Sequence, residues 1–207
     1  MENCTNYELQ LLVNKLNSSN IPSKGIGYNK IEIFYNESNK DIIFNLLNVI
    51  KNNKIGYQFT ASKNNDTINK SIIINLGSRI NLTTEHLTKI LKNLVIEEND
   101  FTIIDNIINN YLTENIEMSI QDNMDYKNSY LITFNEVLNK KDIENNNTYV
   151  VNNNLTNNII HTIVKPEQNG KYKITYRLLY NTIEDLKELL PKQGKTKKLY
   201  NDQLKSL

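Results

Sequence analysis

The chain has 207 residues, of which 39% are hydrophobic, and a formal net charge of +1 at neutral pH. This length allows one large domain or two small ones, and the near-neutral charge argues against strong nonspecific binding of nucleic acid by the whole surface. The single cysteine, Cys4, excludes an internal disulfide and a cysteine-rich zinc cluster. The first ten residues lack the basic and apolar regions of a signal peptide, and no apolar run approaches the ~20 residues of a membrane span. We therefore expect a cytoplasmic protein without a membrane partner.

Asparagine dominates the composition, with 38 residues against one alanine and two arginines. Asn, Ile, Lys and Tyr have AT-rich codons, so this bias is typical of an AT-rich genome such as that of a large virus or mobile element. The other interpretation, a prion-like assembly segment, needs long uninterrupted polar tracts. The richest segment, residues 145–158, is interrupted by Val150, Val151 and Leu155. We favour the codon bias.

The first half of the chain alternates between helical and strand-like patterns. A helix is predicted over residues 5–17, whose apolar residues recur at helical spacing, and a loop over 17–27. Residues 29–35 alternate like a strand. Ser38, three residues before Asp41, predicts the start of a second helix. Strands follow at 57–61 and 71–76, a helix begins at Thr83 or Thr84, and the periodicity of residues 101–112 favours a helix over a strand.

This order of elements predicts an α+β fold with one or two ferredoxin-like or RRM-like units. We divide the chain into an N-terminal helix and linker (1–28), a ferredoxin-like unit (29–112), a second α+β unit (113–190) and a basic tail (191–207). In the second unit, strands are expected at 116–120 and 130–134 and a short helix at 136–144. A β-hairpin over 159–180 turns at Asn169-Gly170, the favoured type I′ pair. Thr182 with Asp185 then starts a helix through Leu190, which Pro191 ends.

Catalytic and metal-binding patterns are missing from the sequence. His86 and His161 lack the nearby nucleophile of a catalytic triad, and two histidines without cysteines do not make a zinc site. Gly25-Ile26-Gly27 lacks the third glycine and the preceding strand of a dinucleotide-binding loop. The acidic pairs Glu97/Glu98 and Glu114/Glu117 are interpreted as solvated. We expect a non-enzymatic protein without a cofactor or metal.

Cations and aromatic residues alternate in the return strand of the predicted hairpin. Such surfaces bind single-stranded nucleic acid, because bases stack on the rings and phosphates pair with the charges. Tyrosines and cations fall on opposite faces of this strand, so the alternative is a solvated basic stripe over a tyrosine-lined core. The candidate nucleic-acid-binding residues, including lysines of the tail, are Lys171, Lys173, Tyr176, Arg177, Lys192, Lys195, Lys197 and Lys198.

Two segments resemble known families. Residues 42–164, with DIIFNLLNVIKNNKIGYQFTA, SIIINLGSRINLTTEHLTKIL and YLITF, resemble the RRM-like region before the zinc knuckles of Gag-like proteins of insect non-LTR retrotransposons. This resemblance implies a Gag-like or nucleoprotein-assembly role, although the knuckles themselves are missing. HTIVKPEQNGKYKITYRLL is similar to the final hairpin of the small, H-type component of RNA polymerase.

The leading functional hypothesis is a non-enzymatic nucleic-acid-binding or nucleoprotein-assembly protein of an AT-rich virus or mobile element. Its partners would be single-stranded RNA or DNA and further copies of itself or a larger protein assembly. The alternative is an accessory or scaffold subunit of a larger complex, such as a viral RNA polymerase or a capsid, that docks through a sheet edge and the terminal helix.

Overall fold

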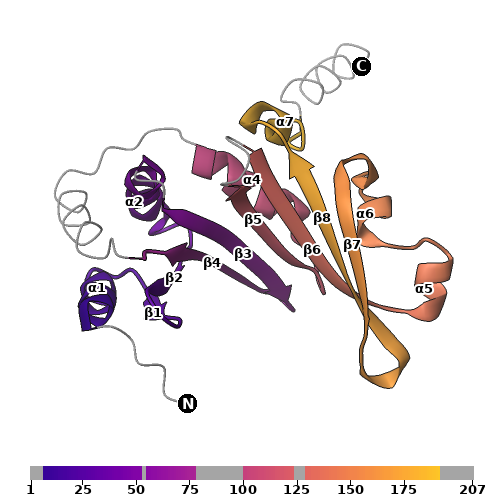
Figure 1. Ribbon diagram of the computed structural model, residues 1–207, viewed down its shortest axis with the longest axis horizontal. Helices are drawn as coiled ribbons and strands as arrows, with labels where there is room; N and C mark the ends of the chain where they lie inside the picture. The colour runs from indigo at the N-terminus through magenta and orange to yellow at the C-terminus, as the bar shows by residue number, and fades with distance from the viewer. Residues whose placement is uncertain (1–6, 53–54, 78–99, 124–128, 192–207) are drawn as a thin grey trace, which may run out of the picture.

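A single antiparallel sheet of eight strands runs through the molecule (Figure 1). The computed structural model describes residues 7–52, 55–77, 100–123 and 129–191. The strands lie in the order β1-β2-β4-β3-β5-β6-β8-β7, and every neighbouring pair is antiparallel. Their bounds are β1 Ser23–Gly25, β2 Lys30–Phe34, β3 Gly56–Asn64, β4 Thr67–Asn75, β5 Glu117–Asn123, β6 Ser129–Asn139, β7 Ile159–Pro166 and β8 Lys171–Tyr180.

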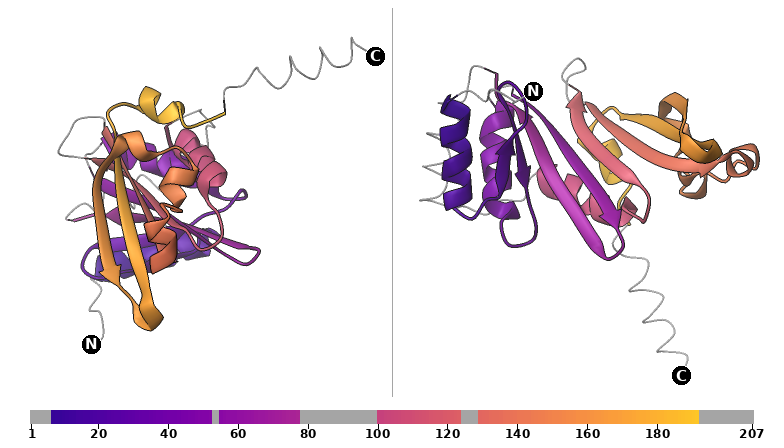
Figure 2. Two further views of the ribbon diagram at one scale, coloured as in Figure 1. Left: turned by 90° about the vertical axis from the view of Figure 1, so that its right-hand side faces the viewer. Right: turned by 90° about the horizontal axis from the view of Figure 1, so that it is seen from below.

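The described helices pack on one face of this sheet (Figure 2). The longer ones have the apolar stripe that the sequence predicts: α1 buries Leu9, Leu12, Val13 and Leu16. Alternate residues of the strands meet these stripes, so that Ile33, Phe59 and Ile132 are each at most 1% exposed. The helices are α1 Tyr7–Ser18, α2 Lys40–Asn52, α4 Asp100–Tyr111, α5 Lys140–Glu144, α6 Tyr149–Asn152 and α7 Ile183–Lys187, with short 3₁₀ turns η1 Thr156–Asn158 and η2 Gln168–Gly170.

The α+β class is confirmed, but the ferredoxin-like unit is not. Strands β2, β3 and β4 have the expected βαββ connection through α2. In a ferredoxin-like unit the fourth strand would return to lie beside the first. Here β5 pairs with β3 instead, from Gln58 opposite Gln121 to Ser62 opposite Glu117. The next strand therefore extends the sheet on the far side, because the edge of β2 is already occupied by β1.

The strand order contains a repeated topology that the sequence pattern does not reveal. The succession helix, two strands, helix, two strands describes both α1 to β4 and α4 to β8, with α5 and α6 together in the place of α2. The spatial orders β1-β2-β4-β3 and β5-β6-β8-β7 are the same. The two units thus join head to tail through β3 and β5. Topologically α4 belongs to the second unit, whereas the sequence-based division placed residues 101–112 in the first.

Several local predictions are confirmed and three differ, the first being that residues 23–25 of the predicted loop 17–27 form β1. Thr182 accepts a hydrogen bond from the Asp185 N–H at 3.0 Å and caps α7, as expected, although α7 ends at Lys187 rather than at Leu190. Asn169 and Gly170 both have positive φ at the tip of the β7–β8 hairpin. Residues 136–139 continue β6 instead of starting a helix, because alternate side chains there still face the core. The helix predicted from Thr83 or Thr84 lies outside the described residues.

Asparagine takes the place of glycine in many turns. Every described non-glycine residue with positive φ is an asparagine: Asn20, Asn29, Asn65, Asn115, Asn146, Asn154 and Asn169. Asparagine tolerates the left-handed region better than other non-glycine residues. The compositional bias therefore supplies turn residues to a chain that has only six glycines.

Candidate nucleic-acid interface

The second face of the sheet carries mostly polar side chains, and no described helix packs on it. Directly opposed residues form a row across neighbouring strands, which we call the polar row: Ser71, Thr60, Ser119, Thr133, Arg177 and His161. Hydrogen bonds link its first members, since the Thr60 and Ser71 hydroxyls lie 2.7 Å apart and Ser71 donates to Glu32 at 2.7 Å. The face thus offers neutral donors and acceptors over several strands.

Two adjoining hollows lie along this face. One, of about 350 Å³, lies over β2, β4, β3 and β5; the other, of about 590 Å³, continues towards β6 and β8. Ser62, Glu117 and Asn135 line both hollows, so the two are continuous. Lys171 and Lys173 line the larger hollow. An extended ligand that follows the polar row would therefore reach cations at the β8 end.

Four cations gather on this face of the β7–β8 hairpin, and we call them the basic stripe: Lys165, Lys171, Lys173 and Arg177. Lys165 lies directly opposite Lys173 across the two strands. Lys173 pairs with Glu117 at 3.4 Å, but no described carboxylate lies within 4.0 Å of the other three cations. Like charges directly opposite each other destabilise a sheet. Glu117 balances one charge of this pair, so the cations that a bound anion would neutralise are Lys165, Lys171 and Arg177.

Tyr176 does not belong to this surface, and its inclusion among the candidate binding residues is corrected. It is 5% exposed and faces the helical layer, because residues of β8 alternate between the faces and Arg177 points the other way. Burial raises the pKa of the Tyr176 phenol to about 12. Of the two interpretations of this strand, the tyrosine-lined core with a basic stripe outside is the one that the structure shows.

The other predicted site residues have separate outcomes. Lys171 and Arg177 are exposed and Lys173 is partly exposed, as their proposed role needs. Lys192, Lys195, Lys197, Lys198 and His86 lie outside the described residues. Lys165 and His161 were missed, although the hairpin register counted back from Asn169-Gly170 would have placed both beside the cations of β8.

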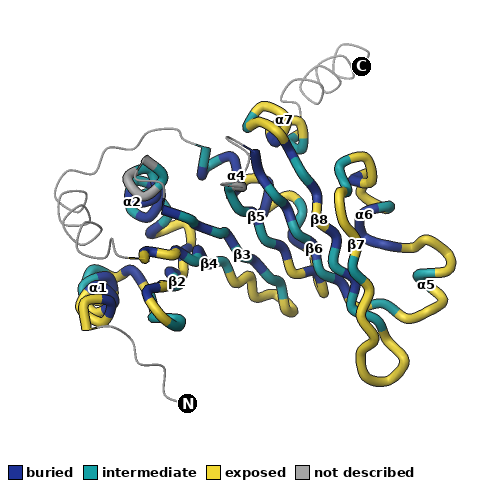
Figure 3. The backbone as a smooth tube through the Cα atoms, in the orientation of Figure 1, coloured by how far each residue is buried: buried dark blue, intermediate teal, exposed yellow. Residues whose placement is uncertain are grey.

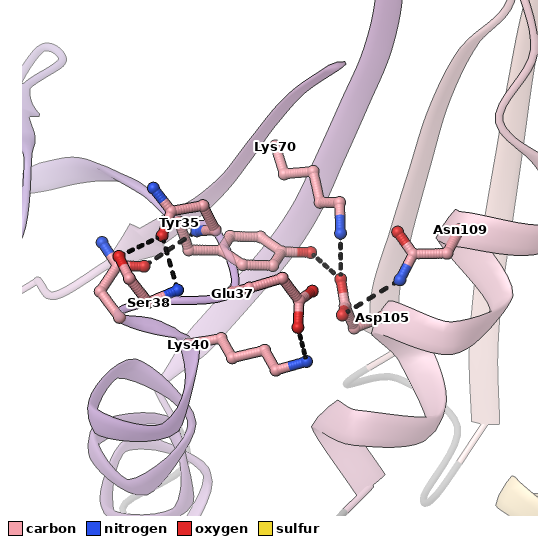
Figure 4. Close-up of polar contacts among 9 residues, drawn as sticks. Tyr35, Glu37, Ser38, Lys40, Lys70, Asp105 and Asn109 are labelled. Atoms are coloured by element: carbon pink, nitrogen blue, oxygen red, sulfur yellow. Dashed lines mark hydrogen bonds and ion pairs between the residues drawn. The ribbon is translucent and has the colours of Figure 1, made fainter.

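A buried polar cluster ties α4 to the first unit (Figure 4). The Asp105 carboxylate, in a residue that is 1% exposed, pairs with the Lys70 ammonium at 2.9 Å and accepts hydrogen bonds from Tyr35 at 3.0 Å and Asn109 at 3.3 Å. Burial and the neighbouring carboxylate raise the pKa of the Tyr35 phenol far above its usual range. Because its donors surround the carboxylate, we interpret this cluster as structural.

A second buried acid supports the other end of the molecule. Glu136 of β6 is 6% exposed, and its carboxylate accepts the Tyr149 N–H at 3.0 and 3.1 Å. It thereby satisfies a backbone donor at the start of α6. Burial raises the pKa of Glu136, and the hydrogen bond from Tyr149 opposes this shift.

Within the described residues, no cluster of three or more His, Cys, Asp or Glu side chains is arranged to hold a metal ion. None of the described helices has the length and apolar character of a membrane span. Comparison of the chain with known protein families, curated proteins and solved structures finds no match. The resemblances to Gag-like proteins and to the small RNA polymerase component stay predictions.

Proposed function

We propose that the protein binds nucleic acid through the sugar–phosphate backbone, which lies along the open sheet face with phosphates at the basic stripe. The observation that carries this proposal is that Lys165, Lys171 and Arg177 gather on one face of the hairpin with no described carboxylate within 4.0 Å, on a molecule of net charge +1. This arrangement lets three cations contact phosphates without breaking an ion pair of the described residues. A polyanion neutralises it and gains the entropy of released counterions.

Contacts with bases would contribute little to this binding. The aromatic side chain of the open face is Phe34, which is 36% exposed at the far end of the sheet and lies under the Lys24 ammonium at 5.1 Å. The basic half of the described face presents no phenylalanine or tyrosine ring, and its one aromatic side chain is the imidazole of His161, opposite Arg177. Stacking is tolerant of base sequence, so a base held on a ring of this face would add little discrimination between sequences. We therefore propose binding that depends on phosphate and not on sequence.

The experiment measures the salt dependence of binding to labelled oligonucleotides. In Lys171→Glu/Arg177→Glu the slope of log affinity against log salt concentration should become shallower by about two, one for each lost phosphate contact. The matched control is Lys141→Glu/Lys187→Glu, which makes the same change in net charge at exposed sites of α5 and α7, on the helical side of the sheet. Its slope should stay near that of the unchanged protein.

Two results would contradict the proposal. One is unchanged affinity and slope in the stripe variant. The other is an equal loss in both variants, which would mean that net charge alone attracts the nucleic acid. Single-stranded and duplex oligonucleotides of several sequences complete the test, and affinities that follow base sequence would remove the backbone-binding form of the proposal.

A further inference from the structure

The two edges of the sheet are treated differently by the chain. At the β1 edge, the backbone groups of Ser23 that point away from β2 are satisfied by one side chain. The Ser23 N–H donates to Asn17 Oδ1 at 2.9 Å, and Asn17 Nδ2 donates to the Ser23 carbonyl at 3.1 Å. This bidentate contact imitates a neighbouring strand. At Ser23 the β1 edge is therefore closed by its own chain.

The β7 edge is open. The Glu167 N–H donates to the Lys171 carbonyl at 2.8 Å, which fixes the phase of the β7–β8 ladder. Hydrogen-bonded pairs alternate along an antiparallel ladder, so Lys165 and Ile163 pair with β8. The N–H and C=O groups of Thr162 and Val164 then point outward. No described side chain donates to or accepts from these outward groups.

The side chains of β7 do not protect this edge. Natural edge strands carry charges, prolines or bulges that prevent pairing with another chain. Here the six residues 159–164, IIHTIV, contain no carboxylate, lysine or arginine and five β-branched residues. Ile160 is 59% exposed and Val164 51%. A bulge near Ile160 and the terminal Lys165-Pro166 limit the length of β7 that can pair, but they leave the residues between them available. Figure 3 shows how exposed β7 is along its length.

We propose that β7 pairs antiparallel with β7 of a second copy of this chain, about a two-fold axis at Thr162. Both strands must contribute outward-pointing groups, which a register centred on any single residue of β7 allows; residues 162 and 163 are the centres at the middle of the strand. Centring on Thr162 places Ile160 of each copy opposite Val164 of the other, so that exposed apolar side chains meet. Centring on Ile163 would oppose Ile160 with Pro166, which has no N–H to donate.

The alternative is head-to-tail assembly of copies into a filament, and the β1 edge of the sheet disfavours it. Inside the molecule the two units join through β3 and β5, and the topological equivalents of these strands are β7 and β1. A filament would therefore join β7 of one copy to β1 of the next. Asn17 already occupies that edge, and β1 has only three residues. A closed dimer uses the open edge twice and leaves β1 undisturbed.

The first experiment measures the molar mass in solution by light scattering and sedimentation, at concentrations up to about 200 μM, where small interfaces associate. The unchanged protein should form a dimer at the upper end of this range. Val164→Lys places a charge on the open edge, and Thr162→Pro removes an N–H that β8 does not use. Both variants should be monomeric with the circular dichroism of the unchanged protein. Ile68→Lys is the matched control, since Ile68 is also 51% exposed but lies at the β3–β4 hairpin.

The second experiment tests the register by cross-linking. In a Cys4→Ser background, Thr162→Cys should oxidise to a covalent dimer, because a directly opposed pair brings the Cα atoms within disulfide range. Ile163→Cys should not, since residue 163 opposes residue 161 of the other copy. A monomer at every concentration would overturn the proposal, as would equal cross-linking of both cysteines. Growth beyond a dimer would overturn it in favour of head-to-tail assembly. Neither experiment uses nucleic acid, so its outcome is independent of the proposed function.

Discussion

Individual buried charges in this protein are held by specific partners, and removal of a partner should measurably lower the free energy of unfolding. Asp105 combines an ammonium, a phenol and an amide around one carboxylate, and these groups come from β4, the end of β2 and α4. The Lys70 ammonium also lies 5.5 Å from the centre of the Tyr35 ring. Removal of one partner leaves the other charge buried and unpaired. The cluster therefore makes the position of α4 depend on a few side chains.

Asp105→Ala should lower the free energy of unfolding by about 3–5 kcal/mol, because Lys70 would keep its charge in a buried site. The double variant Lys70→Met/Asp105→Leu removes both charges and should recover most of this loss. Urea denaturation of the two variants and the unchanged protein checks the difference. Equal destabilisation in both variants would show that packing, not the unpaired charge, determines the loss.

Glu136 makes the stability depend on pH. Because burial raises its pKa above the ordinary value of 4.5, the folded protein holds this proton more tightly than the unfolded chain. The contribution is fully present below 4.5 and is lost as pH rises through the raised pKa. In Glu136→Gln the decrease over this window should become smaller, while the amide oxygen still accepts the Tyr149 N–H; the remainder belongs to groups such as Asp122, whose pKa burial also raises. Urea denaturation at a series of pH values from acidic to neutral measures this change in stability, with Glu144→Gln at an exposed site as the control. If Glu136→Gln has the same pH profile as the unchanged protein, Glu136 is not a source of the pH dependence.

At the scale of single elements, local patterns predicted most of what the structure shows. The stripe of α1, the alternation in β2 and the turn at Asn169-Gly170 are short-range signals, and each element forms where the signal lies. The order of strands could not be predicted in this way. The pairing of β5 with β3 instead of β2 depends on β1, whose three residues, SKG, carry no strand pattern at all.

In the candidate site too, local patterns were predictable and long-range pairing was not. The sequence located Lys171, Lys173 and Arg177 and left two orientations of their strand open. Alternation along β8 shows only that its tyrosines and its cations lie on opposite faces of the strand. Which face is buried depends on the helices that cover the tyrosine face. The polar row could not be predicted, because its residues come from strands whose register is set by long-range pairing.

The whole molecule has a continuous sheet and one buried cluster that includes residues of both units. Phe101 of α4, for example, stacks on Phe59 of β3 and lies edge-on to Tyr57. Such contacts across the β3–β5 junction couple the units energetically. We therefore expect the two units to unfold together, in spite of the repeated topology.

Ile132→Ala in β6 should lower the stability by about 2–5 kcal/mol through the cavity that it leaves. If the units are coupled, the loss should also appear in amides of β2 and β4, far from the change. Hydrogen exchange of the folded protein measures both regions at once. Unaltered protection in β2 and β4 would instead mean two independent domains, as the division at residue 112 implies.

The left-handed asparagines have a consequence for which substitutions the surface tolerates. Six of the seven are exposed: Asn20, Asn65, Asn115, Asn146, Asn154 and Asn169. Exposure normally makes a position permissive, but alanine or a β-branched residue here should cost up to roughly 1–2 kcal/mol, because it lacks the short polar side chain that lets asparagine adopt the left-handed conformation. A saturation mutagenesis map of the surface would thus contain isolated positions that are less tolerant than their exposed neighbours. Glycine would be the best accepted replacement at these points.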